Sequence, residues 1–207
     1  MWRRFGIFTG VCVLSEIVFQ FYKYRYNRSI TKEKEKSTEV LFFPDKKVAC
    51  IKHFTSECES ENCSYSHEEN SLSKLFQYLN KAVHSVDVCV FVLTCTDLAD
   101  LLIQAAERGV RVRVITDSEQ VDIPGSQIWK LRSRGVAVRT DDSSFFMHHK
   151  FVVIDNKKLL NGSFNWTRQA ITGNQENLLV TSDPRLVHLY KEQFSLLWGK
   201  YKAKKDQ

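Results

Sequence analysis

The segment MHHKFVVIDNKKLLNGSFNWT, residues 147–167, holds side chains that could together perform chemistry on a phosphate ester. An imidazole can attack phosphorus, while an amine, an amide and a hydroxyl can bind the nonbridging oxygens and stabilise the added negative charge. Taken singly, each residue is weak evidence for such chemistry, because a β-hairpin can carry polar residues without any such role. The residues with these groups are His148, Lys150, Ser163 and Asn165, and Asp155 adds a carboxylate that we also count among the candidate catalytic residues.

Strand geometry separates the two adjacent histidines. In an extended segment, side chains two residues apart share a face. His148 and Lys150 therefore point the same way and His149 points to the other face, which assigns the catalytic role to His148. Asp155 is an odd number of residues from His148, so its side chain points to the opposite face, and it lies at the end of the strand. An Asp-Asn pair is also common in turns. We expect Asp155 to support the site or the turn.

The elements that must position this segment alternate along the chain. SLSKLFQYLNKAVHS, residues 71–85, has a helical period with a serine available as N-cap. VDVCVFVLT, residues 86–94, is a β-branched run typical of a strand buried on both faces. Further helices are predicted at 97–109, 126–135 and 184–201, and further strands at 110–117, 136–140, 149–154, 158–161 and 177–181. This alternation predicts an α/β fold, a mixed β-sheet with helices on both faces.

Cysteine and histidine recur ahead of this region in VACIKHFTSECESENCSYSHEEN, residues 48–70. Three thiolates and an imidazole suit tetrahedral zinc, and such a site could fold a loop too short to bury its own core. The alternative is an unliganded or redox-active loop. The expected zinc ligands, spaced C-x7-C-x4-C-x3-H, are Cys50, Cys58, Cys63 and His67.

Charge is concentrated at the two ends of the chain, which has a net charge of +6. Residues 1–36 carry eight basic and three acidic side chains, and residues 200–207 carry four lysines and one aspartate. Residues 37–199 are therefore slightly acidic. The body of the protein is not a globally basic nucleic-acid binder, so any attraction for phosphate must be local.

The N-terminal residues 5–22 are mostly apolar and have basic flanks. This length is near the lower limit for a membrane span, and no small residues follow it as a signal-peptide cleavage site would require. We therefore favour a retained anchor over a signal peptide or a soluble helix, although Glu16 and Gln20 are costly in a bilayer. The heavier basic flank follows the apolar run, which favours a cytosolic location for the rest of the chain.

The pattern H-x-K-x4-D, formed by His148, Lys150 and Asp155, is followed by the GSFNWT box. Together they resemble the phospholipase D superfamily, the HKD phosphodiesterases, over most of residues 71–199. Glu176, in NQENLLV, falls where single-motif members have a glutamate that orients the catalytic histidine. The order of anchor, Cys3His insertion and motif is similar to that of small membrane-anchored mitochondrial members.

This resemblance implies a mechanism. His148 would form a phosphohistidine that water resolves, Lys150, Ser163 and Asn165 would bind phosphate oxygens, and Glu176 would accept a hydrogen bond from the imidazole. No catalytic metal or cofactor is implied, and any zinc would be structural. Acid and base exchange roles between the two half-reactions, so two imidazoles must flank one phosphorus. With one motif per chain, we expect a homodimer whose site lies on the twofold axis.

The resemblance also implies two substrates, a mitochondrial membrane phospholipid (cardiolipin, hydrolysed to phosphatidate) and single-stranded RNA, cleaved in piRNA biogenesis. A third hypothesis is a non-catalytic adaptor that binds RNA or protein through the zinc module. The implied location is the mitochondrial outer membrane, with a single N-terminal pass and the catalytic domain in the cytosol. The expected domains are an anchor (1–28), a linker (29–48), the Cys3His insertion (49–70), the catalytic domain (71–199) and a basic tail (200–207).

Overall fold

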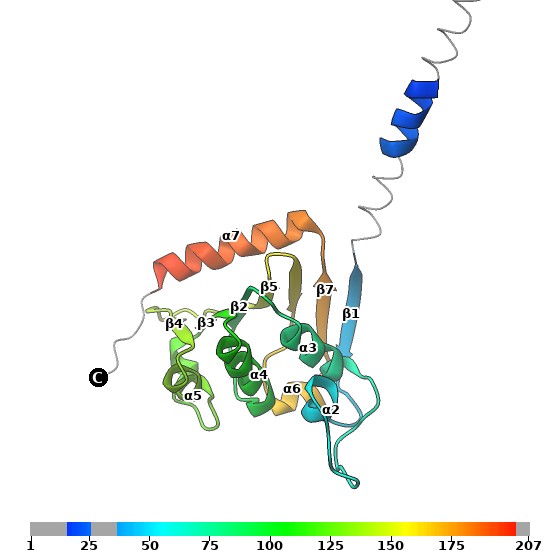
Figure 1. Cartoon of the computed structure of the whole chain (residues 1–207). Helices are drawn as coiled ribbons and strands as arrows, with labels where there is room; N and C mark the ends of the chain where they lie inside the picture. The colour runs from blue at the N-terminus through cyan, green and yellow to red at the C-terminus, as the bar shows by residue number, and fades with distance from the viewer. Residues whose placement is uncertain (1–15, 26–36, 202–207) are drawn as a thin grey trace, which may run out of the picture. The chain divides into compact units, whose positions relative to one another are not determined.

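The computed structural model of the chain describes residues 16–25 and 37–201 (Figure 1). The chain divides into two units, Met1–Ser37 and Thr38–Gln207, and residues 16–25 of the first form a helix. Among the described residues, no helix is long and apolar enough to cross a membrane. Most of the expected anchor, residues 1–15 and 26–28, and the end of the basic tail, residues 202–207, lie outside the described residues.

A seven-stranded mixed sheet forms the centre of the second unit, with the strand order β1-β7-β6-β5-β2-β3-β4. Five strands run in one direction, and β5 and β7 run in the other. The strands are β1 (Thr38–Phe43), β2 (Ser85–Val90), β3 (Arg111–Thr116), β4 (Ala137–Thr140), β5 (Lys150–Ile154), β6 (Lys158–Gly162) and β7 (Glu176–Thr181). We call the end where β1, β2, β3, β4 and β6 begin the amino end of the sheet, and the opposite end the carboxyl end.

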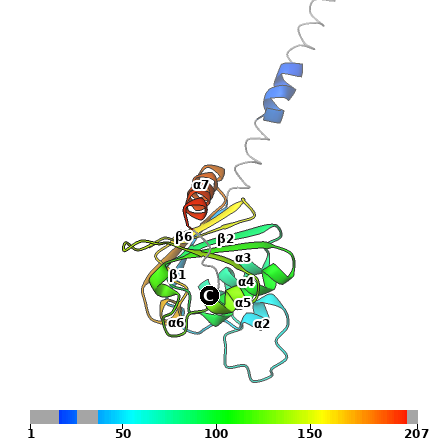
Figure 2. The ribbon, with the colours of Figure 1, turned by 90° about the vertical axis from the view of Figure 1, so that its left-hand side faces the viewer.

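Helices cover both faces of this sheet, which confirms the expected α/β architecture. In Figure 2, α7 lies on one face, and α3, α4 and α5 lie on the other. A large apolar core fills the side of α3, α4 and α5, and a smaller one, which includes Phe151, Val153 and Phe194, lies under α7. The helices are α2 (Ile51–Thr55), α3 (Ser71–Asn80), α4 (Thr96–Glu107), α5 (Ile128–Ser133), α6 (Arg168–Thr172) and α7 (Pro184–Lys200), with a short 3-10 turn at Ser118–Gln120.

Helix α3 begins one residue earlier than it would with Ser71 as its N-cap. Asn70 is the N-cap: its side chain accepts a hydrogen bond from the Ser73 amide at 2.9 Å, and the Asn70 amide donates to the Ser73 hydroxyl at 2.8 Å. Ser73 therefore completes a capping box in which Asn70 supplies the first acceptor. The predicted strand 86–94 is also shorter in the structure, because pairing ends at Val90, although all six residues of β2 are buried as expected.

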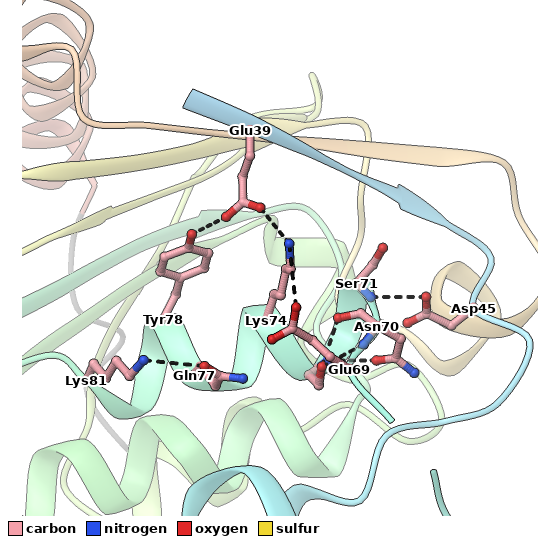
Figure 3. A network of polar contacts seen from close by, with 10 residues as sticks. Glu39, Asp45, Glu69, Asn70, Ser71, Lys74, Gln77, Tyr78 and Lys81 are labelled. Atoms are coloured by element: carbon pink, nitrogen blue, oxygen red, sulfur yellow. Dashed lines mark hydrogen bonds and ion pairs between the residues drawn. The ribbon is translucent and has the colours of Figure 1, made fainter. Parts of the chain in front are cut away.

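Strand β1 is a correction to the expected linker 29–48, since residues 38–43 pair with the whole of β7. Polar contacts tie it to α3 (Figure 3): the Glu39 carboxylate accepts hydrogen bonds from the Tyr78 hydroxyl and, at 2.9 Å, from Lys74 Nζ. Beyond the strand, the Asp45 carboxylate accepts from the Ser71 amide at 3.2 Å. As an edge strand, β1 buries only part of its side chains, so its pattern does not stand out from a linker.

Candidate active site

His148 and Lys150 lie together where β5 begins, at the carboxyl end of the sheet. The centroid of the His148 ring is 4.7 Å from that of Phe91, and Lys150 Nζ is 5.1 Å from the same Phe91 centroid. His149 lies on the other face, 5.5 Å from the Phe151 ring and with Nε2 3.5 Å from Gln193 Nε2 on α7. The two histidines are thus separated as strand parity predicts, and His148 shares its face with Lys150.

The Lys150 ammonium is half-buried beside this ring. Burial lowers the pKa of Lys150, and the charge of Glu176 acts in the opposite direction. Nζ donates a hydrogen bond to the carbonyl oxygen of His148 at 2.8 Å, which connects the cation to the backbone of the histidine. Lys150 is therefore held at the site in a position from which it can neutralise added negative charge.

Ser163 and Glu176 meet where β6 ends and β7 begins. The Ser163 hydroxyl donates to Glu176 Oε2, and the Asn174 amide group donates to Oε1 at 3.1 Å. Gly162 permits this approach, because a Cβ at that position would lie 2.0 Å from the carbonyl oxygen of Asn177. In the described part of the chain, the Glu176 carboxylate thus has Ser163 and Asn174 as its hydrogen-bond partners and not His148.

Asn165 lies in a loop that is pinned to the end of β2. The Trp166 amide donates to the Val92 carbonyl at 3.0 Å, and the Trp166 carbonyl accepts from Thr94 at 2.9 Å. The side-chain oxygen Oδ1 of Asn165 is buried and has no hydrogen-bond partner within the described residues. Because Oδ1 can only accept a hydrogen bond, any contact between Asn165 and a phosphate oxygen would come from its Nδ2 group.

Asp155 lies at the amino end of the sheet, about 16 Å along β5 from Lys150. Its carboxylate accepts hydrogen bonds from the amides of Val83, His84 and Ser85, the shortest at 2.6 Å. Burial would raise the pKa of Asp155, but these backbone hydrogen bonds outweigh it and lower the pKa. Asp155 therefore supports the β5–β6 turn, and a direct contact with phosphate at His148 is excluded by distance.

Two further residues position the site and were not identified from the sequence. Phe91 follows β2, and its ring contacts both the His148 ring and the Lys150 ammonium group. Asp117, 1% exposed, follows β3, and its Oδ2 accepts a hydrogen bond from the Met147 amide at 2.9 Å, which fixes the backbone just before His148. The carboxyl ends of parallel strands are common positions for functional side chains, and this rule could have drawn attention to Asp117.

The solvent side of the site is apolar. Phe145 is 83% exposed and Phe146 is 60% exposed. The Phe146 ring centroid lies 5.3 Å from that of Phe91 and 6.4 Å from that of His148. The Phe91 and Phe146 rings lie beside the histidine, and with the exposed Phe145 they could stack on a base, contact an acyl chain or pack against another protein surface.

The four expected zinc ligands come together in one cluster. One ligand atom from each of Cys50, Cys58, Cys63 and His67 lies within 4.8 Å of all the others. Three sulfurs and one ring nitrogen at this spacing fit a tetrahedral metal after small shifts. The cluster is joined to the fold by hydrogen bonds from the Cys50 amide to the Ser66 carbonyl and from the Ser66 amide to the Val48 carbonyl, both 2.8 Å.

The match to known proteins agrees with this fold. Residues 75–198 match the family model described as cardiolipin synthase, PLD-like domain. The chain therefore belongs to the phospholipase D superfamily, and it is a phosphodiesterase of the phospholipase D type.

Relatives resemble the chain over most of its length. A mitochondrial cardiolipin hydrolase from Xenopus laevis is 41% identical over 201 residues, which cover 97% of this chain and 92% of the relative. The protein of the same description from Chlamydomonas reinhardtii is 47% identical, with coverage of 79% and 74%, respectively. Among solved structures, the phospholipase D family member Nuc from Salmonella typhimurium has a TM-score of 0.65 at 23% identity, covering 83% of this chain and 99% of Nuc. This likeness to Nuc shows a shared fold.

Proposed function

We propose that this phosphodiesterase cleaves its substrate through a covalent phosphohistidine on His148. The observation that carries the proposal is the shared face of His148 and Lys150 at the start of β5, against the ring of Phe91. A ring nitrogen of His148 attacks phosphorus, the bond to the leaving oxygen breaks, and that oxygen takes a proton from a second imidazole. Water then attacks the phosphohistidine, the second imidazole takes a proton from this water, and the bond between phosphorus and His148 breaks.

The remaining site residues act on charge and orientation. Lys150 and Asn165 bind the nonbridging oxygens, and Ser163 assists them. Glu176 holds Ser163 in place and, when the site is complete, orients an imidazole by accepting from its second nitrogen. The position of Lys150 beside His148 and the charge of Glu176 close to Lys150 support these roles, and Asn165 would donate from its Nδ2 group.

The second imidazole comes from a second copy of the chain. One chain has a single motif, and His149 cannot supply the acid because it lies on the opposite face toward α7. A twofold axis would place His148 of each protomer on one phosphorus. The exposed rings of Phe145 and Phe146 would then lie beside or within the interface.

For the substrate, we propose a mitochondrial membrane phospholipid of the cardiolipin type, single-stranded RNA, or both. The names of the relatives support the lipid and a mitochondrial location. The aromatic rings beside His148 suit stacking on unpaired bases as well as acyl chains. The apolar N-terminal segment anchors the protein in the outer mitochondrial membrane with its catalytic domain in the cytosol, and the Cys3His cluster binds a structural zinc ion.

A parallel assay tests the proposal. The full-length protein is given cardiolipin vesicles and a single-stranded RNA in separate reactions, with His148→Asn as the control. Release of phosphatidate or of RNA fragments that His148→Asn abolishes supports the corresponding substrate. Activity on neither, with RNA binding intact in both proteins, would contradict the catalytic proposal and favour an adaptor.

A further inference from the structure

The two ends of the sheet differ in their exposed charges. At the amino end, basic side chains are exposed on the loops and helix ends that surround the β5–β6 turn. We call this set the basic rim: Lys81, His84, Arg108, Arg111, Lys157 and Arg185. Backbone contacts hold these segments together, because the Arg111 amide donates to the His84 carbonyl at 3.1 Å and the Asp155 amide donates to the Ser85 carbonyl at 2.8 Å.

Several cations of the basic rim lack an acidic partner. Within the described residues, Lys81, Arg108 and Lys157 have no carboxylate within ion-pair distance: Lys81 contacts a glutamine and Arg108 a backbone carbonyl. The neighbouring carboxylates are already engaged, Asp155 by backbone amides and Glu107 by Arg134. Arg111 and Arg185 are paired with Asp87 and Asp183, so the positive charge that the basic rim presents comes mainly from Lys81, Arg108 and Lys157.

At the carboxyl end of the sheet, the exposed side chains near β3 and β4 are negatively charged. Glu119, Asp122 and Asp142 are exposed on the loops that follow these strands. The second unit thus carries a charge difference along the strand direction. A flat anionic surface would attract the amino end and repel this part of the carboxyl end.

Exposed apolar side chains accompany the cations. Val83 lies in the loop before β2 and is 65% exposed, and Leu186 and Leu189, on the first turns of α7, are 38% and 59% exposed. Leu186 and Leu189 are three residues apart and so share one side of the helix. Apolar side chains within a ring of lysine and arginine are typical of protein surfaces that rest on membrane head groups.

The chain itself enters the second unit at this end. Thr38, the first residue of β1, is paired with Thr181, the last residue of β7, and their hydroxyls are 2.9 Å apart. Figure 1 shows the beginning of α7 close to the start of β1. The point at which the N-terminal segment joins the second unit therefore lies at the same end of the sheet as the basic rim.

We infer that the basic rim rests on the anionic surface of the bilayer that holds the anchor, with Val83 and Leu186 among the head groups. This inference rests on the proposed anchor. It has a consequence for catalysis, because His148 lies at the opposite end of β5, at least about 16 Å from that surface. RNA can then reach the site directly from the aqueous side, whereas a phospholipid of the same bilayer has to leave the surface directly beneath the protein.

Photo-cross-linking of the full-length protein tests this orientation. Benzoylphenylalanine replaces Val83 in one variant and Trp129, which is 49% exposed at the start of α5, in a control variant. Both are reconstituted in phosphatidylcholine vesicles with and without phosphatidylglycerol. Position 83 should form lipid adducts that increase with phosphatidylglycerol, and position 129 should form few in either mixture.

A charge reversal sharpens the test. Lys81→Glu with Lys157→Glu should reduce lipid adducts at position 83 at least about tenfold in anionic vesicles. The matched control is Lys46→Glu with Lys47→Glu, an equal charge change at exposed positions beyond the other end of β1, which should leave the adducts unchanged. Equal adducts at positions 83 and 129, adducts from 83 to a second protein chain, or equal effects of the two reversals would overturn the inference.

Flotation of the same samples separates this inference from the proposed anchor. A protein that floats with neutral vesicles is anchored, and its adduct pattern then decides the orientation alone. A protein that does not float contradicts the anchor and, with it, the orientation.

Discussion

The ring of Phe91 lies 4.7 Å from the imidazole of His148, centroid to centroid. Lys150 Nζ is 5.1 Å from the same ring, so one aromatic side chain supports both the expected nucleophile and the expected phosphate-binding cation. An aromatic ring attracts a cation near its face and does not compete with phosphate for hydrogen bonds. Phe91 is therefore a positioning residue, which holds the two groups without occupying their polar atoms.

The Lys150 ammonium predicts how activity depends on alkaline pH. Burial lowers the pKa of Lys150 below its ordinary value, and the ring of Phe91 stabilises the charged form. Activity should fall as the pH rises through this lowered pKa, because the neutral amine cannot balance phosphate charge. Phe91→Leu should shift the fall to lower pH, Phe91→Tyr should leave it near the wild-type position, and Lys150→Arg should shift it to higher pH. The measurement is kcat/KM against pH with bis(p-nitrophenyl) phosphate, and an identical alkaline limb in all four proteins would refute the assignment.

The two histidines should respond very differently to the same substitution. His148→Asn removes the attacking nitrogen and should reduce phosphodiesterase activity at least about 1,000-fold. His149→Asn changes a side chain that faces Phe151 and α7, and should keep activity within about threefold. Thermal unfolding of both variants controls for folding. Equal losses from two equally stable variants would remove the basis for choosing His148.

Asp155 should matter for stability and not for the chemical step. Asp155→Asn replaces charge-assisted hydrogen bonds to the Val83, His84 and Ser85 amides by neutral ones, and should cost about 1–2 kcal/mol of unfolding free energy. Asp142→Asn, at an exposed position, is the control and should cost less than about 0.5 kcal/mol.

The stabilisation by Asp155 should decrease at acidic pH. The pKa of Asp155 is lower in the folded protein than in the unfolded chain, so its contribution is complete above the unfolded value of about 3.9. The contribution is lost as the pH falls through the folded pKa. Urea unfolding should therefore show a constant difference from wild type near neutral pH and a shrinking one below about pH 4. A difference that grows on acidification would contradict this account.

The cysteine cluster should bind one zinc ion per chain. Cys58→Ser removes a ligand and should abolish stoichiometric zinc, measured by elemental mass spectrometry, and lower the melting temperature. His53→Ala is the matched control, because the His53 ring stacks on His67 at 4.2 Å without belonging to the cluster of ligand atoms. This variant should keep its zinc. Loss of zinc from His53→Ala, or its retention in Cys58→Ser, would require another ligand set.

Local patterns in the sequence predict much of the fold and part of the site. The face of His148 follows from the two-residue period of a strand, and the ends of α4 and α5 follow from Gly109 and Gly135, which have φ angles of 87° and 79°. These features depend on residues close to one another in the chain. The sequence left Asp155 open between the site and the turn and grouped it with the catalytic residues, whereas its hydrogen bonds to three backbone amides place it in the turn.

Features that depend on pairing between distant segments could not be predicted in the same way. Phe91 reaches His148 because β2 pairs with β5, with Val90 opposite Lys150, and nothing in either segment specifies that register. Strand β1 has a partner only on one side, so its TEVLFF sequence is too weakly patterned to separate it from a linker. The helices α2 and α6 have only five residues each and show no full helical period.

The central claim is that two copies of His148 complete one site, and a purified heterodimer tests it most directly. Wild-type and His148→Asn chains with different affinity tags are co-expressed, the mixed dimer is isolated, and its activity is measured at once. Because each phosphorus needs an attacking and a protonating imidazole, the account predicts that the mixed dimer is as inactive as the His148→Asn homodimer. Half of the wild-type activity in that heterodimer would show that each chain works alone and would contradict the account.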